Sequence, residues 1–327
     1  MILVTGGAGY IGSHMAKWLH QAGYPVVVFD NLSTGKRSLA RYGEWMEGDL
    51  NNPDDLTHCF ERFPIRAVIH FAARSLVGES VRMPLLYYQN NVAGTLNLLH
   101  AMADAGVKHI IFSSTAAVYG NPQQLPIPET HPKQPINPYG RSKWMMEQLI
   151  EDAVSAMGLH AVSLRYFNAA GADPAGELGE CHDPETHLIP LVLKAALGKR
   201  SAITIFGQDY PTPDGTPVRD YIHVWDLVAA HELALQALLA GELQGYQVFN
   251  LGTGKGYSVK EVIHTAQRLL ESEGVSIPVQ TGARRVGDPP VLVAKADQVQ
   301  QVLGWMPRLS DLETMIQHAW CWEKAQR

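Results

Sequence analysis

The sequence has little cysteine, no cluster of basic residues and no long apolar run, and each shortage argues against a class of protein. Its apolar runs fall short of the roughly 20 residues that span a bilayer, and Met1 to Thr5 shows no secretory signal. The net charge of −6 includes no block of Lys or Arg, which argues against nucleic acid and anionic membranes as partners. The three cysteines are odd in number and scattered, which predicts reduced thiols in a cytoplasmic protein; they are Cys59, Cys181 and Cys321.

Short apolar runs alternate with longer helix-like stretches through the first half of the 327 residues. The predicted strands are apolar throughout, as in strands buried on both faces of a parallel sheet; they are Ile2–Thr5, Val26–Phe29, Ala67–His70, Ile110–Ser113 and Ala161–Leu164. The predicted helices between them are Ile11–Ala22, Pro53–Arg62, Leu86–Ala105 and Tyr139–Met157. Repeated β-α-β units of this spacing predict an α/β fold with a doubly wound, Rossmann-like parallel sheet.

The composition changes after Asn168. Residues 169–187 are rich in Gly, Pro, Asp and Glu, which predicts a loop over a site. Strands are predicted beyond this loop at Ala202–Phe206, Val248–Leu251 and Ile277–Thr281, and helices at Leu188–Leu197, Asp226–Ala240 and Val259–Glu271. We therefore expect a first domain over residues 1–168 and a smaller α/β domain over 169–327, from which Gln247–Asn250 could return to the main sheet.

A glycine-rich segment, Gly6-Gly7-Ala8-Gly9-Tyr10-Ile11-Gly12, follows the first predicted strand and opens a helix. This context favours dinucleotide binding. Gly6 would permit the tight turn, Gly9 would let backbone N–H groups approach a diphosphate, and Gly12 would let the helix pack closely on the strand. The diphosphate would then lie at the positive end of the helix. The alternative interpretation is a glycine turn that binds nothing.

Asp30 ends the second predicted strand, 21 residues after Gly9. A carboxylate there accepts hydrogen bonds from the ribose of NAD and repels the 2′-phosphate of NADP. Lys36 and Arg37 argue weakly for NADP, but a short basic pair after a loop is usually solvated, so the sequence predicts NAD. Asp49 suits a hydrogen bond to adenine, and Phe71-Ala72-Ala73 follows a strand on the side where ligands bind. The alternative interpretation is that Asp49 and Phe71-Ala72-Ala73 are ordinary loop residues.

Tyr139 and Lys143 are four residues apart on one face of a predicted helix. A tyrosine has an ordinary pKa of ~10 and is a poor base at neutral pH. Positive charge from Lys143 and from oxidised nicotinamide would favour the phenolate and lower the pKa of Tyr139. The pair alone is a weak signal, but the glycine loop upstream and Ser113-Ser114-Thr115 after a strand make a hydride-transfer site the better interpretation.

With these motifs the chain resembles the extended short-chain dehydrogenase/reductases and, within them, the UDP-glucose (UDP-galactose) 4-epimerases. The resemblance runs nearly from end to end. Its most specific stretches are Thr5–His14, Asp30–Leu32, His70–Ala73, Val77–Ser80, Ser113–Gly120, Pro138–Lys143, Arg165–Gly171, Thr186–Pro190, Val218–Val224 and Arg284–Asp288.

The resemblance implies an NAD-binding domain over 1–168, a UDP-sugar-binding domain over 169–327 and three groups of site residues. The catalytic residues would be Thr115, Tyr139 and Lys143. The expected cofactor contacts are Gly6, Gly9, Tyr10, Ile11, Gly12, Asp30, Asn31, Ser33, Thr34, Gly35, Asp49, Leu50, Phe71, Ala72, Ala73, Ser75, Asn90, Tyr139, Lys143, Tyr166 and Phe167. The expected substrate contacts are Thr115, Tyr139, Asn168, His187, Leu188, Thr204, Phe206, Arg219, Arg285, Asp288 and Leu292.

The implied reaction is a reversible oxidation at C4 of the sugar. Tyr139 would remove the hydroxyl proton while NAD takes the hydride, the 4-keto sugar would rotate, and the hydride would return to the opposite face. Related 4,6-dehydratases carry an acidic pair after the catalytic threonine, where this chain has Ala116-Ala117, so the sequence argues against a dehydratase. The family commonly forms homodimers through a four-helix bundle, which implies pairing through the helices at Leu86–Ala105 and Tyr139–Met157.

Some positions leave alternatives open. Leu292 stands where a tyrosine restricts related epimerases to glucose and galactose, so N-acetylated or pentose UDP-sugars are the alternative substrates; a non-catalytic NAD sensor is a remoter one. Related enzymes often have lysine in place of Ser75 and asparagine in place of His187, which leaves both contacts open. Cys181, His182, Asp183, Glu185 and His187 look like metal ligands, but their spacing fits no closed zinc pattern, so we expect no metal.

Overall fold

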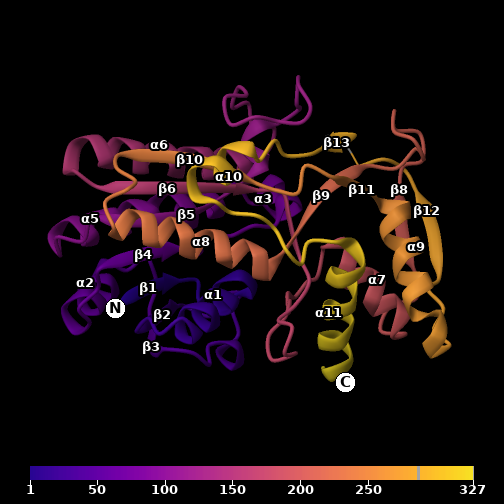
Figure 1. Cartoon of the computed structure of the whole chain (residues 1–327), viewed down its shortest axis with the longest axis horizontal. Helices are drawn as coiled ribbons and strands as arrows, with labels where there is room; N and C mark the ends of the chain where they lie inside the picture. Colours follow the sequence, from indigo (N-terminus) through magenta and orange to yellow (C-terminus); the bar gives the residue numbers. More distant parts are fainter. Residues whose placement is uncertain (286–287, 327) are drawn as a thin grey trace.

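The computed structural model describes residues 1–285 and 288–326 of the chain, and a parallel β-sheet forms its centre (Figure 1). Among these residues, seven strands pair in the order β10-β6-β5-β4-β1-β2-β3. The order reverses beside β1, as in a doubly wound sheet. The strands are β1 (Ile2–Thr5), β2 (Val26–Asp30), β3 (Glu44–Glu47), β4 (Ala67–His70), β5 (His109–Thr115), β6 (His160–Tyr166) and β10 (Tyr246–Leu251).

Both faces of this sheet are covered by helices, which is why the central strands β1, β2 and β4 are almost entirely apolar. Alternate residues of a strand face opposite sides, so Ile2 and Val4 pack with α1 (Tyr10–Gln21) and α8 (Val224–Leu239) in one core. Leu3 lies in a second core on the other face. The helices that contribute to this second core are α2 (Pro53–Arg62), α5 (Gly94–Asp104) and α6 (Pro138–Met157).

The segment between β4 and β5 is more broken than the sequence predicts. We expected one helix over Leu86–Ala105. The chain instead forms α3 (Val77–Arg82), α4 (Pro84–Tyr87), a π-helical turn over Tyr88–Ala93 and then α5. Single π-helical turns of this kind are frequently found at functional sites.

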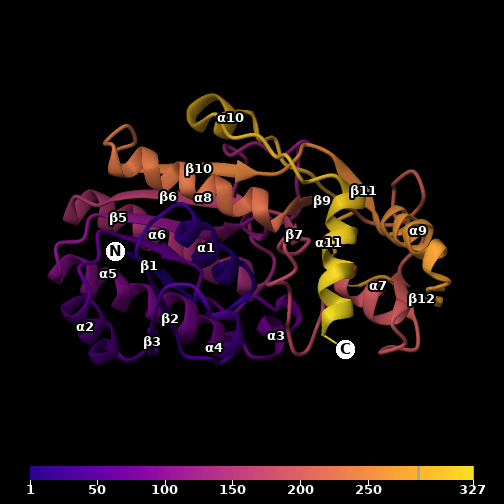
Figure 2. The ribbon, with the colours of Figure 1, turned by 60° about the horizontal axis from the view of Figure 1, so that its bottom comes forward.

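The second part of the chain forms smaller sheets and helices beside the main sheet, to the right in Figure 1. Its strands are β7 (Asn168–Ala170), β9 (Val218–His223), β11 (Gly256–Ser258) and β13 (Val291–Leu292) in one sheet, and β8 (Ile203–Phe206) with β12 (Val279–Gly282) in another. Its helices are α7 (Leu188–Ala196), α9 (Val259–Leu270) and α11 (Leu312–Ala325), whereas α10 (Asp297–Leu303) packs on β10 and α8 of the main sheet. α11 stands between the main sheet and α9 in both ribbon views (Figure 2). Short 3₁₀ turns occupy Arg37–Leu39, Ala116–Tyr119 and Glu271–Glu273.

Segments beyond residue 168 also complete the main sheet. β10 pairs in parallel with β6, which confirms the expected return of Gln247–Asn250 to the main sheet, and α8 packs on the same face as α1. β9 was not predicted, because its sequence VRDYIH mixes charged and apolar residues. The α/β, doubly wound fold class is confirmed. Within the described parts of the chain, no helix combines the length and apolar character that a membrane crossing requires.

Candidate active site

An open cavity of about 1150 Å³ lies at the carboxyl ends of the central strands and extends to the second part of the chain. Gly6, Asp30, Phe71, Thr115 and Phe167 line it, and each stands at or directly after the end of a sheet strand. In doubly wound sheets ligands bind at this edge. Of the predicted site residues, all but four line the cavity; those four are Gly35, Leu188, Thr204 and Phe206.

The glycine loop fits a dinucleotide diphosphate at its backbone. Gly6 has φ +71°, and a Cβ there would come within 2.6 Å of the Ala72 backbone nitrogen. A Cβ on Gly12 would lie 2.1 Å from the Gly6 carbonyl oxygen, so the helix could not pack against the turn. Gly9 is the N-cap of α1 and has no side chain over the free N–H groups of the first turn. A backbone this closely packed, ending in bare N–H groups at a helix N-terminus, is a site for a diphosphate.

Asp30 is held in a fixed position next to this loop. Its Oδ2 accepts a hydrogen bond from the Ala8 N–H at 3.0 Å and its Oδ1 from the Leu32 N–H at 2.8 Å. Burial raises the pKa of Asp30, and these two hydrogen bonds oppose the rise. A carboxylate in this place has lone pairs left for the hydroxyls of a ribose.

Asp49 and Asn31 form a second polar contact on the same wall. The Asn31 amide donates to Asp49 Oδ2 at 3.0 Å, and the Asn51 N–H donates to Asp49 Oδ1 at 2.8 Å. Burial raises the pKa of Asp49, but the hydrogen bonds from Asn51 and Asn31 outweigh burial and lower it overall. The carboxylate is therefore charged and available to an adenine amino group at neutral pH.

The π-helical turn brings two asparagines to the site. Asn90 lines the cavity, as expected. Asn91 is buried, accepts a hydrogen bond from the Arg74 N–H at 2.8 Å and donates one to Ser142 Oγ at 2.9 Å. Asn91 thus ties the loop after β4 to the helix that carries Tyr139. The sequence analysis missed it, and the adjacent pair of asparagines inside an apolar helical pattern was the available signal.

Tyr139, Lys143 and Thr115 meet in the middle of the cavity. Lys143 Nζ donates to the Ser113 carbonyl at 2.8 Å. Burial lowers the pKa of Lys143 to about 7, and the charge of Glu147 opposes this shift. Burial raises the pKa of Tyr139, and a hydrogen bond with Thr115 opposes it. In the chain alone, therefore, the phenol of Tyr139 is protonated at neutral pH.

The expectation that Lys143 would lower the pKa of Tyr139 is wrong for the chain without cofactor, in which the pKa is raised. The Lys143 side-chain nitrogen is directed at the Ser113 carbonyl. With a pKa of about 7, Lys143 is only partly charged at neutral pH, so its electrostatic effect on the Tyr139 phenol is weak. The additional positive charge must come from a bound group. Oxidised nicotinamide would supply it.

The far end of the cavity is lined by charged residues of the second part of the chain. Arg219 and Asp288 form an ion pair with each other, and the Arg285 guanidinium lies over the Phe206 ring, 4.3 Å from its centroid. Leu292 packs in a small apolar cluster with Phe167. The structure therefore brings together three of the predicted uridine-diphosphate contacts, Arg219, Arg285 and Asp288, and places Phe206 behind Arg285.

The loop after β7 contributes a cluster that the sequence showed only in part. Glu180 Oε1 lies 2.5 Å from His187 Nδ1 and 2.8 Å from His182 Nδ1. Burial lowers the pKa of His187, but the charges of Glu180 and Glu185 outweigh it and raise the value to about 10. Burial raises the pKa of Glu180, and His187 and His182 together bring it down to about 2. The sequence analysis overlooked Glu180 because it precedes the Cys181–His187 segment.

Comparison with known proteins agrees with this geometry. The sequence model of the NAD dependent epimerase/dehydratase family matches residues 2–252. The UDP-glucose 4-epimerase of Halalkalibacterium halodurans is 51% identical over 323 residues, which cover 99% of this chain and 95% of that protein. The structure of the Brucella ovis UDP-glucose 4-epimerase in complex with NAD has a TM-score of 0.94 at 50% identity, covering 98% and 97% of the two chains. That of the Bifidobacterium longum enzyme, in complex with NAD⁺ and UDP, has a TM-score of 0.92 at 39% identity, covering 99% and 98%.

Proposed function

The chain belongs to the NAD dependent epimerase/dehydratase family, and we propose that it interconverts UDP-galactose and UDP-glucose by epimerisation at C4 of the hexose. It is an NAD-dependent isomerase that acts on a nucleotide sugar. The observation that carries the proposal is the position of Tyr139, Lys143 and Thr115 between a dinucleotide cradle and a basic pocket within one cavity.

The cofactor would be held by the residues whose geometry fits it. The N-terminus of α1 would bind the diphosphate, Asp30 the adenosine ribose, Asp49 the adenine, and Lys143 the nicotinamide ribose. When bound, NAD supplies a reversible two-electron acceptor for C4 of the sugar. Contacts along the whole length of the cofactor fit an NAD that stays bound through the cycle.

The chain's own residues move the proton. Tyr139 would take the proton of the C4 hydroxyl as general base and return it after the 4-keto sugar has turned. Thr115 hydrogen-bonds Tyr139 and would share the reacting oxygen with it. Lys143 holds its position through the Ser113 carbonyl and adds positive charge as it becomes protonated.

The two residues that directly follow the catalytic threonine could not drive elimination of water. Ala116 and Ala117 line the cavity directly after Thr115 and carry no acid. A 4,6-dehydratase needs an acid and a base at this point. Epimerisation needs no acid or base at these two positions, since the Tyr139 phenol removes the proton in one direction and returns it in the other.

The uridine diphosphate would lie at the other end of the cavity. Arg219 and Arg285 suit the diphosphate because guanidinium groups bind phosphate in a bidentate way. Asp288 would accept hydrogen bonds from the uridine ribose. Its present ion pair with Arg219 would then be shared with the ligand.

Leu292 bears on the choice of sugar. It lines the cavity beside Phe167 and Ala116, so its size sets the room near the sugar ring. We propose glucose and galactose as the main sugars, with the N-acetylated pair or pentoses as the second candidates. Equal turnover numbers for UDP-galactose and UDP-N-acetylgalactosamine would remove this ordering.

A homodimer is the proposed assembly. Large apolar side chains remain exposed on helices that contact one another; they are Val77, Val81, Met83, Leu85, Leu96 and Met145. They come from α3, the α3–α4 junction, α4, α5 and α6, which contact one another. An exposed patch of this kind marks a protein interface. Division into domains at residue 168 and a cytoplasmic location remain predictions from the sequence.

The test is to incubate the purified protein with UDP-galactose and no added NAD, and to quantify UDP-glucose. We expect conversion to proceed to equilibrium, with NAD released only on denaturation. Tyr139→Phe should lower kcat by about 10²- to 10⁴-fold, the usual contribution of a general base, while retaining NAD. Unchanged turnover in Tyr139→Phe would overturn the assignment of the base.

A further inference from the structure

The loop that precedes α7 brings four metal-binding side chains together at the edge of the cavity. One ligand atom from each of Glu180, His182, Glu185 and His187 lies within 4.8 Å of the other three. We propose that these residues bind one divalent transition-metal ion of the zinc type, and that the ion inhibits the enzyme.

The cluster differs from the one that the sequence suggested. Cys181 is turned away, since its Sγ accepts a hydrogen bond from Lys36 Nζ at 2.8 Å, and Asp183 is exposed. Glu180 takes part instead. The resulting set of two imidazoles and two carboxylates needs no second cysteine, and it is a donor set that Zn²⁺ accepts.

The distances are short enough for one ion to be shared. His187 Nδ1 lies 2.5 Å from Glu180 Oε1 and 3.2 Å from Glu185 Oε1, and His182 Nδ1 lies 2.8 Å from Glu180 Oε1. Tetrahedral zinc with bonds of about 2.1 Å separates its ligand atoms by about 3.4 Å. Small rotations about side-chain bonds, by about an ångström or less at the ligand atoms, would admit the ion.

The cluster offers two buried carboxylates, and the ion would replace the proton that His187 shares with Glu180. The side chains of Glu180 and Glu185 are 6% and 4% exposed, so two carboxylates are concentrated in a dry place. Glu185 Oε1 accepts bonds from the N–H groups of Thr186 and His187. Within the described residues its Oε2 has no hydrogen-bond partner, and Lys194 Nζ is 3.9 Å away. A buried carboxylate oxygen left without a hydrogen bond is unfavourable, and coordination would satisfy it.

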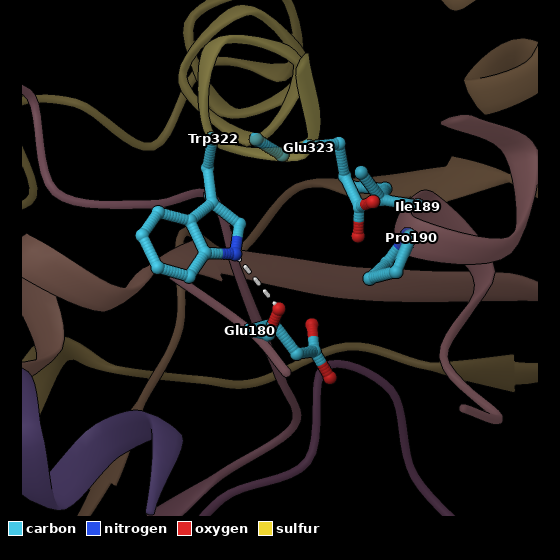
Figure 3. A pocket seen from close by; sticks show the side chains of 7 residues that line it. Glu180, Ile189, Pro190, Trp322 and Glu323 are labelled. Atoms are coloured by element: carbon cyan, nitrogen blue, oxygen red, sulfur yellow. Dashed lines mark hydrogen bonds between the residues drawn. The ribbon is translucent and has the colours of Figure 1, made fainter. Parts of the chain in front are cut away.

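The backbone of Glu180 is held in place by a hydrogen bond from α11. The indole N–H of Trp322 in α11 donates to the Glu180 backbone carbonyl at 2.9 Å (Figure 3). Beneath this contact is a cavity of about 10 Å³ lined by Glu180, Pro190 and Glu323, which is room for about one water molecule. A hydrogen bond of this kind, from behind a ligand residue, holds that residue in place before the metal arrives.

Inhibition follows from the position of the cluster. Glu180, His182 and His187 all line the main cavity, and His187 is the expected substrate contact directly before α7. A bound ion would occupy His187 and stiffen the eight-residue segment that carries all four ligands. The UDP-sugar would lose a contact and some of the freedom of the loop.

Binding is tested on chelator-treated, NAD-loaded protein, by calorimetric titration with ZnCl₂ in the absence of any UDP-sugar. We expect one ion per chain, and no binding of MgCl₂. His182→Ala and Glu185→Gln should each weaken zinc binding by at least about tenfold, with folding of each variant checked by circular dichroism. His264→Ala, an exposed histidine of α9, is the matched control and should leave the affinity unchanged.

The proposed reaction plays no part in this binding measurement, so the two can fail separately. Wild-type protein that binds no zinc, or equal affinity in wild type and His182→Ala, would overturn the site. For inhibition, zinc should reduce turnover of UDP-galactose by the wild type and EDTA should restore it, while His182→Ala should resist zinc. Full occupancy without loss of turnover would refute the inhibitory role.

Discussion

At the scale of single residues, the site depends on ionisable side chains whose neutral forms are favoured by burial. Lys143 is 3% exposed, and Tyr139 lies one helical turn before it. Burial disfavours the charged form of both side chains, which lowers the pKa of Lys143 and raises that of Tyr139. The sequence predicted which residues these are, because the Tyr-x-x-x-Lys spacing is local. It could not predict the opposite pKa shift of Tyr139, because that depends on the depth of the cavity and on the direction of the Lys143 ammonium.

Lys143 should reduce the stability of the fold at neutral pH. Its pKa is about 7 in the folded chain and 10.5 as a free side chain, so the unfolded chain binds more protons between these values. Stability therefore rises with pH from about 7 to about 10.5. We expect Lys143→Met to raise the free energy of unfolding at pH 6.5 by on the order of 2 kcal/mol and to abolish turnover. Denaturant titration at pH 6.5 and pH 10 measures this, and an equal gain at both pH values would contradict it.

Glu147 is a second buried charge, and it anchors three elements. Glu147 accepts hydrogen bonds from Arg165 Nε at 2.9 Å and from Ser114 Oγ. The side chains of Glu147 and Arg165 are almost fully buried. Removing one partner of a buried pair typically costs about 3–5 kcal/mol. We expect Glu147→Gln to lower the free energy of unfolding by that amount. Glu313→Gln breaks the exposed pair with Arg268 and should cost less than about 1 kcal/mol. Similar losses in the two variants would refute the role of burial.

At the scale of elements, local sequence patterns predicted what is periodic and missed what is not. The buried strands β1, β2 and β4 were predicted because they are apolar on both faces. β9 was not predicted because charged residues interrupt its apolar pattern. Arg219 lines the cavity, and the strand pairs with β11 in the small sheet. The π-helical turn could not be predicted, since it arises from Asn91 bonding to the loop after β4 and to α6.

The turn between β1 and α1 should tolerate no side chain at Gly12. An added Cβ would lie 2.1 Å from the Gly6 carbonyl oxygen, which is backbone and cannot rotate away. We expect Gly12→Ala to lose bound NAD and to unfold with a free energy lower by about 2–4 kcal/mol. Gly78→Ala in α3, where a Cβ would meet nothing within 4 Å, is the control and should not lower stability. Normal NAD content in purified Gly12→Ala would count against the proposed cradle.

At the scale of the whole molecule, two parts of the chain share one cavity, and one face of the first part remains apolar. The composition change after Asn168 predicts a division of the chain there, but the return of β10 and α8 to the main sheet depends on tertiary pairing and could not be read from composition. The apolar face follows from α3 to α6 packing side by side, which sequence periodicity shows only for each helix alone.

The proposed dimer is tested on this face. Leu85 in α4 is 79% exposed, and a charge there would be buried in the interface. We expect Leu85→Glu to shift the protein from dimer to monomer in light scattering after size exclusion. Val302→Glu in α10, also exposed but away from this face, should leave the mass unchanged. A wild-type monomer, or a Leu85→Glu dimer of unchanged affinity, would contradict the assembly.

The central claim is that C4 of the sugar is oxidised and then reduced within one cavity. Its most direct test uses UDP-galactose deuterated at C4, in ordinary water and without added NAD, followed by mass and NMR analysis of the UDP-glucose formed. The proposed reaction predicts that deuterium remains at C4 of the product. Loss of deuterium to the solvent, or conversion only when stoichiometric NAD is added, would contradict it.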